Sequence, residues 1–282
     1  MTERYQFTVC SLGENPELFT CINSLLQIKQ SSKQDIELLV VINGSIFKST
    51  FGPEVSIVFE PRRGYSNVRN KAIASTPSNS NVIFLDDDEI PTVQWFNAII
   101  EAHKKYPGEI ITGPILPDGD SSVTTFRGQV AARYTSMSDG QMLKQAPTSN
   151  MFIPSALIHR NLIYFDPIFN HSGSEDTDLC FRLRNQGVKI RFATNALLKE
   201  RQKEERFSQK YIDARRIRDI ANYSLVIKRN STFGRILLRY LTEISRAVIY
   251  SLLSVFTTAY AVKRKAHVRS LIVLITRKPA NP

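Results

Sequence analysis

The feature that most constrains the fold is a short apolar run that ends in four acidic residues. Residues 82–85 are Val-Ile-Phe-Leu, residues 86–89 are Asp-Asp-Asp-Glu, and Pro91 follows closely. An unbroken apolar run of this length is typical of a strand buried on both faces, as in the parallel sheets of α/β proteins. The acids would then lie at the carboxyl end of the strand, where open α/β sheets bind ligands.

These adjacent carboxylates repel one another, which raises the pKa of each unless solvent or a cation offsets the repulsion. A divalent cation is the natural partner, because oxygen-only ligands suit Mg²⁺ or Mn²⁺. An isolated acidic run would more often be a solvated turn. The buried strand before the acids and the proline after them favour a binding site, so we expect Mg²⁺ or Mn²⁺ here.

Apolar runs alternate with helix-like segments over the first 200 residues. This alternation indicates βαβ units and a mostly parallel sheet, a Rossmann-like α/β fold. Neither a Gly-x-Gly-x-x-Gly fingerprint nor a P-loop occurs. The polar segment 118–146 is weakly patterned, as in excursions that frame an acceptor site. Strands are predicted at 7–12, 36–42, 55–59, 82–85, 110–117, 147–154 and 188–193, and helices from 15, 62 and 92 onward.

A second acidic cluster opens a predicted helix at residues 174–187. Glu175, Asp176 and Asp178 fall in its first turn, Ser174 is expected to cap it, and Gly187 is expected to end it. Acids in a first turn often do no more than complement the helix dipole. Without other context, that explanation would be preferred over a functional one.

The charge of the chain is concentrated near its C-terminus. The net charge is +11, and residues 228–278 contain eleven Lys and Arg but one acid, Glu243, a local charge of +10. Residues 247–262 are uncharged, yet they fall short of the roughly 20 apolar residues that span a bilayer. We therefore expect a basic, amphipathic helical extension on an anionic membrane surface. Packing on the preceding α/β domain or a homodimer interface is the alternative.

Nucleic acid is not the expected partner, because the basic residues alternate with long aliphatic runs and no base-reading motif occurs. The three cysteines, Cys10, Cys21 and Cys180, have neither metal-ligand spacing nor the even number of a disulfide framework, which fits a reducing compartment. Residues 1–6 are polar and lack an apolar signal core. The expected location is the cytoplasm, peripheral to the inner face of the cell membrane.

Together these segments resemble the family-2 glycosyltransferases of the GT-A fold, which are inverting and depend on nucleotide sugars. The resemblance covers roughly residues 6–200, and no single motif carries it. Residues 40–45 are similar to the family's strand-two sequence Val-Val-Asp-Asn-Gly-Ser, and Gly64 with Arg69 and Asn70 is similar to its Gly-x-x-x-Ala-Arg-Asn helix. Residues 85–88 with Pro91 resemble the Asp-x-Asp metal motif, and residues 173–183 resemble the Glu-Asp helix.

The resemblance implies a role for each matched residue. Asp88 would hold the metal that bridges the donor diphosphate, and Asp176 would be the general base. An inverting displacement needs a base on the acceptor hydroxyl and a cation on the departing diphosphate. Arg69 would help to neutralise phosphate, and Asp86 and Asp87 would contact the ribose or the metal shell. The other substrate-binding candidates are Asn43, Glu175 and His171.

One position departs from the family pattern. The family usually has an acid where Ile42 stands, and isoleucine packs against a base without accepting its N–H. UDP, the commonest donor carrier of the family, is expected, with dTDP and GDP left open. Ile42 is also the one hint of a degenerate, non-catalytic membrane-bound assembly factor. A metal-dependent phosphohydrolase that uses residues 86–89 is the other alternative.

The expected architecture is thus a GT-A catalytic domain at 1–200, with a nucleotide-binding half at about 1–91 and an acceptor-side half at about 92–200, followed by a C-terminal helical extension at 201–282. The expected activity is metal-dependent, inverting hexosyl transfer from a nucleotide sugar. The expected acceptor is a lipid-linked glycan in polysaccharide, capsule or lipopolysaccharide synthesis.

Overall fold

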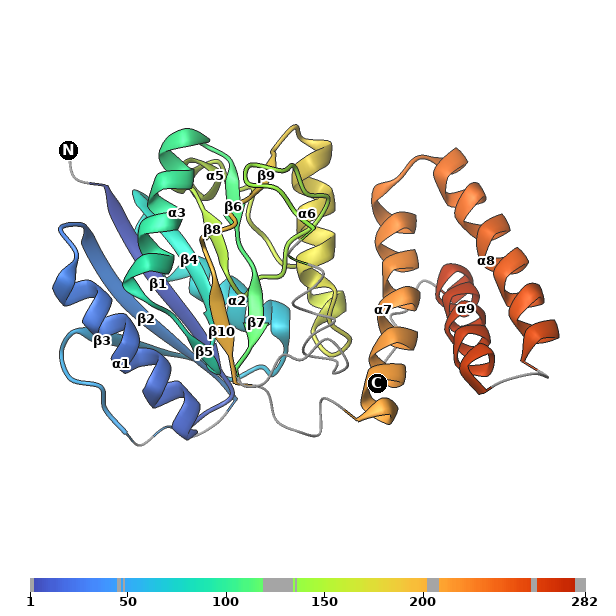
Figure 1. The fold of residues 1–282 in the computed structure, drawn as a ribbon, viewed down its shortest axis with the longest axis horizontal. Helices are drawn as coiled ribbons and strands as arrows, with labels where there is room; N and C mark the ends of the chain where they lie inside the picture. The colour runs from blue at the N-terminus through green and yellow to red at the C-terminus, as the bar shows by residue number, and fades with distance from the viewer. Residues whose placement is uncertain are drawn as a thin grey trace.

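A computed structural model of the 282-residue chain describes residues 3–44, 47, 49–118, 134, 136–201, 208–254 and 258–276. A mixed α/β part is followed by three long helices that stand beside it (Figure 1). Most of the polar segment expected to frame the acceptor, residues 119–133 and 135, lies outside the described residues.

The main sheet has the strand order β3-β2-β1-β4-β8-β6-β9 within the described residues. The first four strands are parallel, β8 runs antiparallel to both of its neighbours, and β6 and β9 are again parallel. The predicted, mostly parallel α/β sheet is therefore confirmed. The strands are β1 (Arg4–Ser11), β2 (Asp35–Asn43), β3 (Val55–Glu60), β4 (Ser80–Asp86), β6 (Ile110–Thr112), β8 (Met151–Ile153) and β9 (Ile190–Phe192).

Helices cover both faces of this sheet, as alternation along β2 shows. Leu38 and Val40 pack in the cluster formed with α1 and α3, whereas Leu39 and Val41 pack in the cluster formed with α2, α5 and α6. A central strand buried on both faces needs such continuous apolar sequence. The helices are α1 (Pro16–Ser31), α2 (Tyr65–Ala74), α3 (Val93–Lys105), α5 (Ser155–His159), the 3₁₀ helix η1 (Pro167–Phe169) and α6 (Glu175–Asn185).

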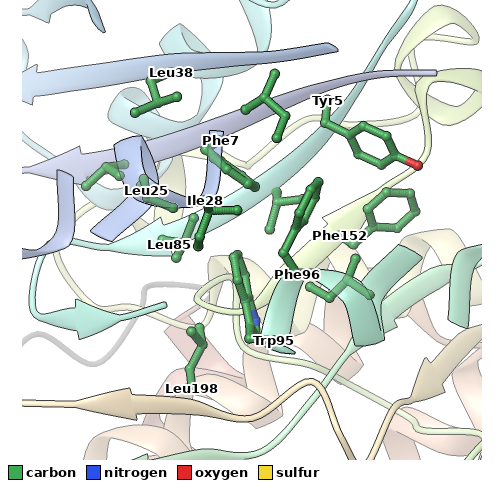
Figure 2. Packing of buried hydrophobic residues seen from close by; sticks show 14 of the residues in the cluster. Tyr5, Phe7, Leu25, Ile28, Leu38, Leu85, Trp95, Phe96, Phe152 and Leu198 are labelled. Carbon is green, nitrogen blue, oxygen red and sulfur yellow. The ribbon is translucent and has the colours of Figure 1, made fainter. Parts of the chain in front are cut away.

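The larger cluster is built around aromatic rings between the sheet and α3 (Figure 2). Phe7 and Phe96 meet edge to face, with ring centroids 5.0 Å apart. Burying each such ring contributes about 1.5–3 kcal/mol to stability. The buried Trp95 donates its indole N–H to Asn150 Oδ1 at 2.8 Å, so its polar atom is also satisfied.

A second, three-stranded sheet consists of β5 (Glu89–Ile90), β10 (Leu198–Glu200) and β7 (Ile115–Pro117). The single strand predicted at 110–117 is therefore wrong, because β6 and β7 belong to different sheets. Gly113 and Pro114 cause the break: proline has no N–H for a ladder, and a Cβ on Gly113 would lie 2.0 Å from Ala196 O. This small sheet begins directly after the acids at 86–88, because β5 starts at Glu89.

Three helices form the C-terminal part: α7 (Gln209–Asn230), α8 (Phe233–Leu253) and α9 (Thr258–Thr276). Helix α9 packs against both α7 and α8, and α7 packs against α6 (Figure 1). The predicted helical extension is confirmed, while the domain boundary at residue 200 stays a prediction. The uncharged run 247–262 does not form one helix, because it covers the end of α8 and the start of α9.

Within the described residues, no helix is long and apolar enough to cross a bilayer.

Candidate active site

Arg69 of α2 joins the two acidic groups that lie far apart in the sequence. Its guanidinium forms an ion pair with Glu175 at the start of α6, and its Nη2 lies 3.8 Å from Asp86 Oδ1 at the end of β4. The Arg69 side chain is 10% exposed and that of Glu175 is 5% exposed. The carboxyl end of β4 and the amino end of α6 therefore meet at one buried cation.

The surroundings of Arg69 hold it in this place. Its Cζ lies 5.9 Å from the ring centroids of Tyr65 and of Phe165. The next residue, Asn70, donates to Phe165 O at 2.7 Å and accepts from Phe165 N at 2.8 Å. The family resemblance led us to expect Arg69 on a phosphate, but here its charge is directed at two carboxylates.

Asp87 is held by the turn that connects β1 to α1. Its Oδ2 accepts hydrogen bonds from Ser11 Oγ at 2.5 Å and from Asn15 Nδ2 at 2.8 Å. Asn15 also caps α1, because its Oδ1 accepts from Leu18 N at 2.7 Å. The sequence predicted Asn15 as the helix start but gave no sign that Ser11 and Asn15 would fix Asp87.

Asp88 lies in the turn between β4 and β5, and its side chain is partly exposed. Its backbone oxygen accepts from Arg201 N at 2.8 Å, directly after the antiparallel pairing of β5 with β10. The small second sheet therefore sets the position of the predicted metal ligand. The sequence did not predict this, because β5 and β10 are too short to show a pattern.

Glu89 points inward, unlike the three aspartates before it. Its Oε2 accepts from Asp86 N at 3.1 Å, and its buried Oε1 has no hydrogen-bond partner among the described residues. Burial, together with the negative charges of Asp86 and Glu200, raises the pKa of Glu89 well above its usual value. Glu89 therefore stabilises the turn from its buried side, while the three aspartates before it are partly exposed.

Asp176 is partly buried in the first turn of α6. Both hydrogen bonds that it accepts from described residues end on Oδ1, from Thr177 N at 2.6 Å and from Thr177 Oγ1 at 3.2 Å. Burial raises the pKa of Asp176, and the positive charge of Arg69 opposes this rise. No described residue donates a hydrogen bond to its Oδ2. A carboxylate with a raised pKa is a better proton acceptor than an ordinary one.

Ser174 does not cap α6 with its side chain, so that prediction is wrong. Its backbone has φ 76°, in the left-handed region, and its side chain makes no capping hydrogen bond. The turn before α6 is instead held from α7, where the buried Asn222 donates to Ser172 O at 3.1 Å. This turn carries His171, which is exposed and beside the start of the helix.

Asn43 is 2% exposed and holds the loop that leads into α2. Its Nδ2 donates to Glu60 O at 3.0 Å and to Arg62 O at 2.8 Å, and its Oδ1 accepts from Gly64 N at 2.9 Å. The sequence led us to expect a substrate contact, whereas in this position the side chain supports the loop from inside.

The acidic residues suit a divalent cation held largely by its substrate. Within the described part of the chain, no group of three or more His, Cys, Asp or Glu side chains is placed to hold a metal. One or two carboxylates with substrate phosphates are the usual ligands of Mg²⁺. The effect of Asp86 and Asp88 on the pKa of Glu89 shows that negative potential is concentrated here. The residues present therefore fit such an ion.

A cavity of about 470 Å³ lies elsewhere, between α6 and the C-terminal helices, and includes Asp178, Arg182 and Arg229 among its lining residues. Asp86, Asp88 and Asp176 do not line it. Four of its charged lining residues form ion pairs with one another: Asp178 with Arg182 at 2.8 Å, and Arg229 with Asp166.

Comparison with known proteins places the chain in a family. The model of "Glycosyl transferase family 2" matches residues 7–164, more than half of the chain. "Pre-mycofactocin glycosyltransferase" of two Mycobacterium tuberculosis strains is 28% identical over 159 residues, and the match covers 51% of this chain and 32% of the relative. The chain thus spans about a third of the length of these curated relatives.

Among solved structures, the chain is similar to GalNAc-T7 crystallised with UDP, GalNAc and Mn²⁺. The TM-score is 0.57 at 12% sequence identity, over 79% of this chain and 48% of that one. At this identity the similarity concerns the fold, and it confirms the expected GT-A architecture. With the family match over residues 7–164, it follows that the chain belongs to glycosyltransferase family 2.

Proposed function

We propose that the chain is a metal-dependent, inverting glycosyltransferase that moves a sugar from a UDP-sugar to a glycan acceptor. The observation that carries this proposal is the contact of Arg69 with both Asp86 and Glu175. That contact links the strand end beside the predicted metal ligand with the helix start that carries the predicted base. In this proposal the strand end binds the donor, the helix start receives the acceptor, and both belong to one site.

Asp176 acts as the general base on the acceptor hydroxyl. Thr177 orients the carboxylate through Oδ1, and Oδ2 takes the proton as the hydroxyl attacks the sugar. Arg69 keeps enough of this carboxylate ionised by opposing the effect of burial on its pKa. A positioned base of this kind contributes roughly 10²–10⁴-fold to the rate.

Asp88 would hold Mn²⁺ or Mg²⁺, with Asp86 beside it, and Asp87 would contact the nucleotide from the turn fixed by Ser11 and Asn15. When bound, the cation offsets the charge that develops on the departing diphosphate. Asn43 shapes the nucleotide side of the site through the loop it holds, and His171 lies on the acceptor side.

The choice of UDP and Mn²⁺ is supported by the structural neighbour, which was crystallised with both. A lipid-linked acceptor in polysaccharide, capsule or lipopolysaccharide synthesis is supported by the basic C-terminal helices. These helices also support a cytoplasmic location at the inner face of the membrane, through an anionic surface.

A donor screen tests the proposal. The purified chain is incubated with UDP-, GDP- and dTDP-sugars, with Mn²⁺, with Mg²⁺ or with a chelator, and with or without a lipid-linked glycan pool. We expect nucleoside diphosphate release that requires both the cation and the acceptor, and a product heavier by one sugar in mass spectrometry.

Two results would contradict it. Hydrolysis of the sugar nucleotide at the same rate without acceptor would identify a phosphohydrolase. If calorimetry with UDP, GDP and dTDP in the presence of Mn²⁺ detected no binding, a non-catalytic assembly factor would be the correct description.

A further inference from the structure

Helix α8 has an apolar face that no described part of the chain covers. Eight large apolar side chains on this helix are between 47% and 78% exposed. They recur every three or four positions, so they share one side of the helix, which is about 30 Å long. We call this side the outer face of α8: Phe233, Leu237, Leu238, Leu241, Ile244, Val248, Ile249 and Leu252.

The opposite side of α8 packs against the other C-terminal helices, mainly α9. Glu243 is completely buried there, 3.0 Å from Arg239 Nη2 and 2.7 Å from His267 Nδ1 of α9. Ala247, one turn later, is buried as well. Figure 1 shows α8 at the edge of the molecule away from the sheet, so the α/β part does not reach the outer face either.

The charge around the outer face has one sign. Glu243 is the only acidic residue from position 220 to the end of the chain, and it is buried in the pairs just described. The exposed charged side chains of α8 and α9 within the described residues are all basic: Arg235, Arg246, Lys265 and Arg269. The occupant of this face must therefore accept apolar side chains and basic ones together.

We propose that α8 lies flat in the interface of an anionic bilayer, with its outer face inserted and Arg235 and Arg246 at the lipid headgroups. The affinity of such helices for a membrane comes from the apolar area that they bury and from the attraction of their basic residues to anionic lipids. A second copy of the chain would bring the same basic groups against one another. Nucleic acid offers no apolar surface for eight aliphatic and aromatic side chains.

This inference deepens the proposed membrane location and rests on it, but vesicle binding is measured without sugar transfer, so the two can fail separately. The test uses the full-length chain and flotation with vesicles of phosphatidylcholine, alone or mixed with phosphatidylglycerol. The test variant is Leu241→Glu with Val248→Glu. The matched control is Val93→Glu with Met142→Glu, which adds the same charge at exposed apolar positions outside α8.

We expect the wild type and the control to float with mixed vesicles, and the α8 variant to lose at least ten-fold in partitioning. A Leu241→Ser, Val248→Ser variant is expected to lose binding as well, and it keeps the test valid if the glutamates disturb folding. Light scattering without vesicles should give the same mass for every variant.

Three outcomes would overturn the proposal. One is a wild-type chain that does not float with anionic vesicles, and another is an α8 variant that floats as well as the control. The third is a wild-type dimer in solution that dissociates when the α8 substitutions are made. The last result would assign the outer face to a second copy of the chain.

Discussion

At the scale of single residues, Arg69 connects the two acidic groups, because its guanidinium contacts one residue of each. It is the basic member of the Arg-Asn pair of α2, and only the structure shows that its guanidinium turns toward Asp86 and Glu175. The sequence identified the acids because their types and order are unusual. It did not reveal that Glu89 turns inward and Asn43 supports a loop, because side-chain direction depends on packing between distant segments.

Replacing Asp176 with Asn removes the proposed base while keeping the size of the side chain. We expect kcat to fall by roughly 10²–10⁴-fold and the affinity for the sugar nucleotide to stay nearly unchanged, because a base acts in the transition state. Steady-state kinetics and calorimetry measure the two effects. Glu101→Gln, an exposed substitution on α3, is the control. Full activity of Asp176→Asn would refute the assignment of the base.

The pH profile tests the link between Arg69 and Asp176. Because Asp176 must be ionised to accept a proton, kcat/KM should fall as the pH falls through its pKa, which burial raises. Arg69 lowers that pKa, so Arg69→Ala should move the acid limb of the profile to higher pH, and Arg69→Lys should move it less. A merely structural role would lower activity at every pH and leave the limb in place.

At the scale of elements, the long strands were predictable and the short ones were not. Strands β1, β2 and β4 follow from continuous apolar sequence. Strands β5 and β10 have two and three residues, and their pairing is fixed by tertiary contacts that leave no local pattern. The break between β6 and β7 was signalled by Gly113 and Pro114, but the apolar residues on either side favoured one strand.

Gly113→Ala tests the close approach between the two sheets. Its new Cβ would lie 2.0 Å from Ala196 O, a backbone atom that moves only with the chain before β10. Overpacking of this kind costs about 1–3 kcal/mol, so we expect a lower free energy of unfolding in urea. Gly234→Ala on α8 is the control, because it meets no atom within 4 Å. Equal stability of both variants would contradict the close contact.

At the scale of the whole molecule, positive charge and exposed apolar surface coincide in the C-terminal helices, while the proposed catalytic residues lie in the near-neutral part. The sequence predicted this charge distribution and an amphipathic extension. It did not locate the apolar face, because the uncharged run 247–262 covers only the end of α8 and the start of α9. The relevant helix begins earlier, at Phe233, and its buried residues are Glu243 and Ala247, whereas its large apolar side chains are exposed.

Salt should weaken vesicle binding without abolishing it. Raising the ionic strength from about 0.1 M to 1 M shortens the Debye length from roughly 10 Å to 3 Å, which screens the basic residues but not the inserted side chains. Flotation across a salt series measures this. Binding that did not change with salt would mean that Arg235 and Arg246 contribute nothing.

The burial of Glu243 affects the conditions under which the proposed membrane-bound protein would dissociate from the bilayer. Within the described residues, the exposed charged side chains of α8 and α9 are all arginine or lysine, and no carboxylate or histidine is among them. Acidification of the surroundings therefore leaves the cationic surface as it was, and attachment should be constant from mildly acidic to mildly alkaline conditions. Release would be governed by lipid composition, so that a change in the anionic fraction of the leaflet, and not in proton concentration, redistributes the protein.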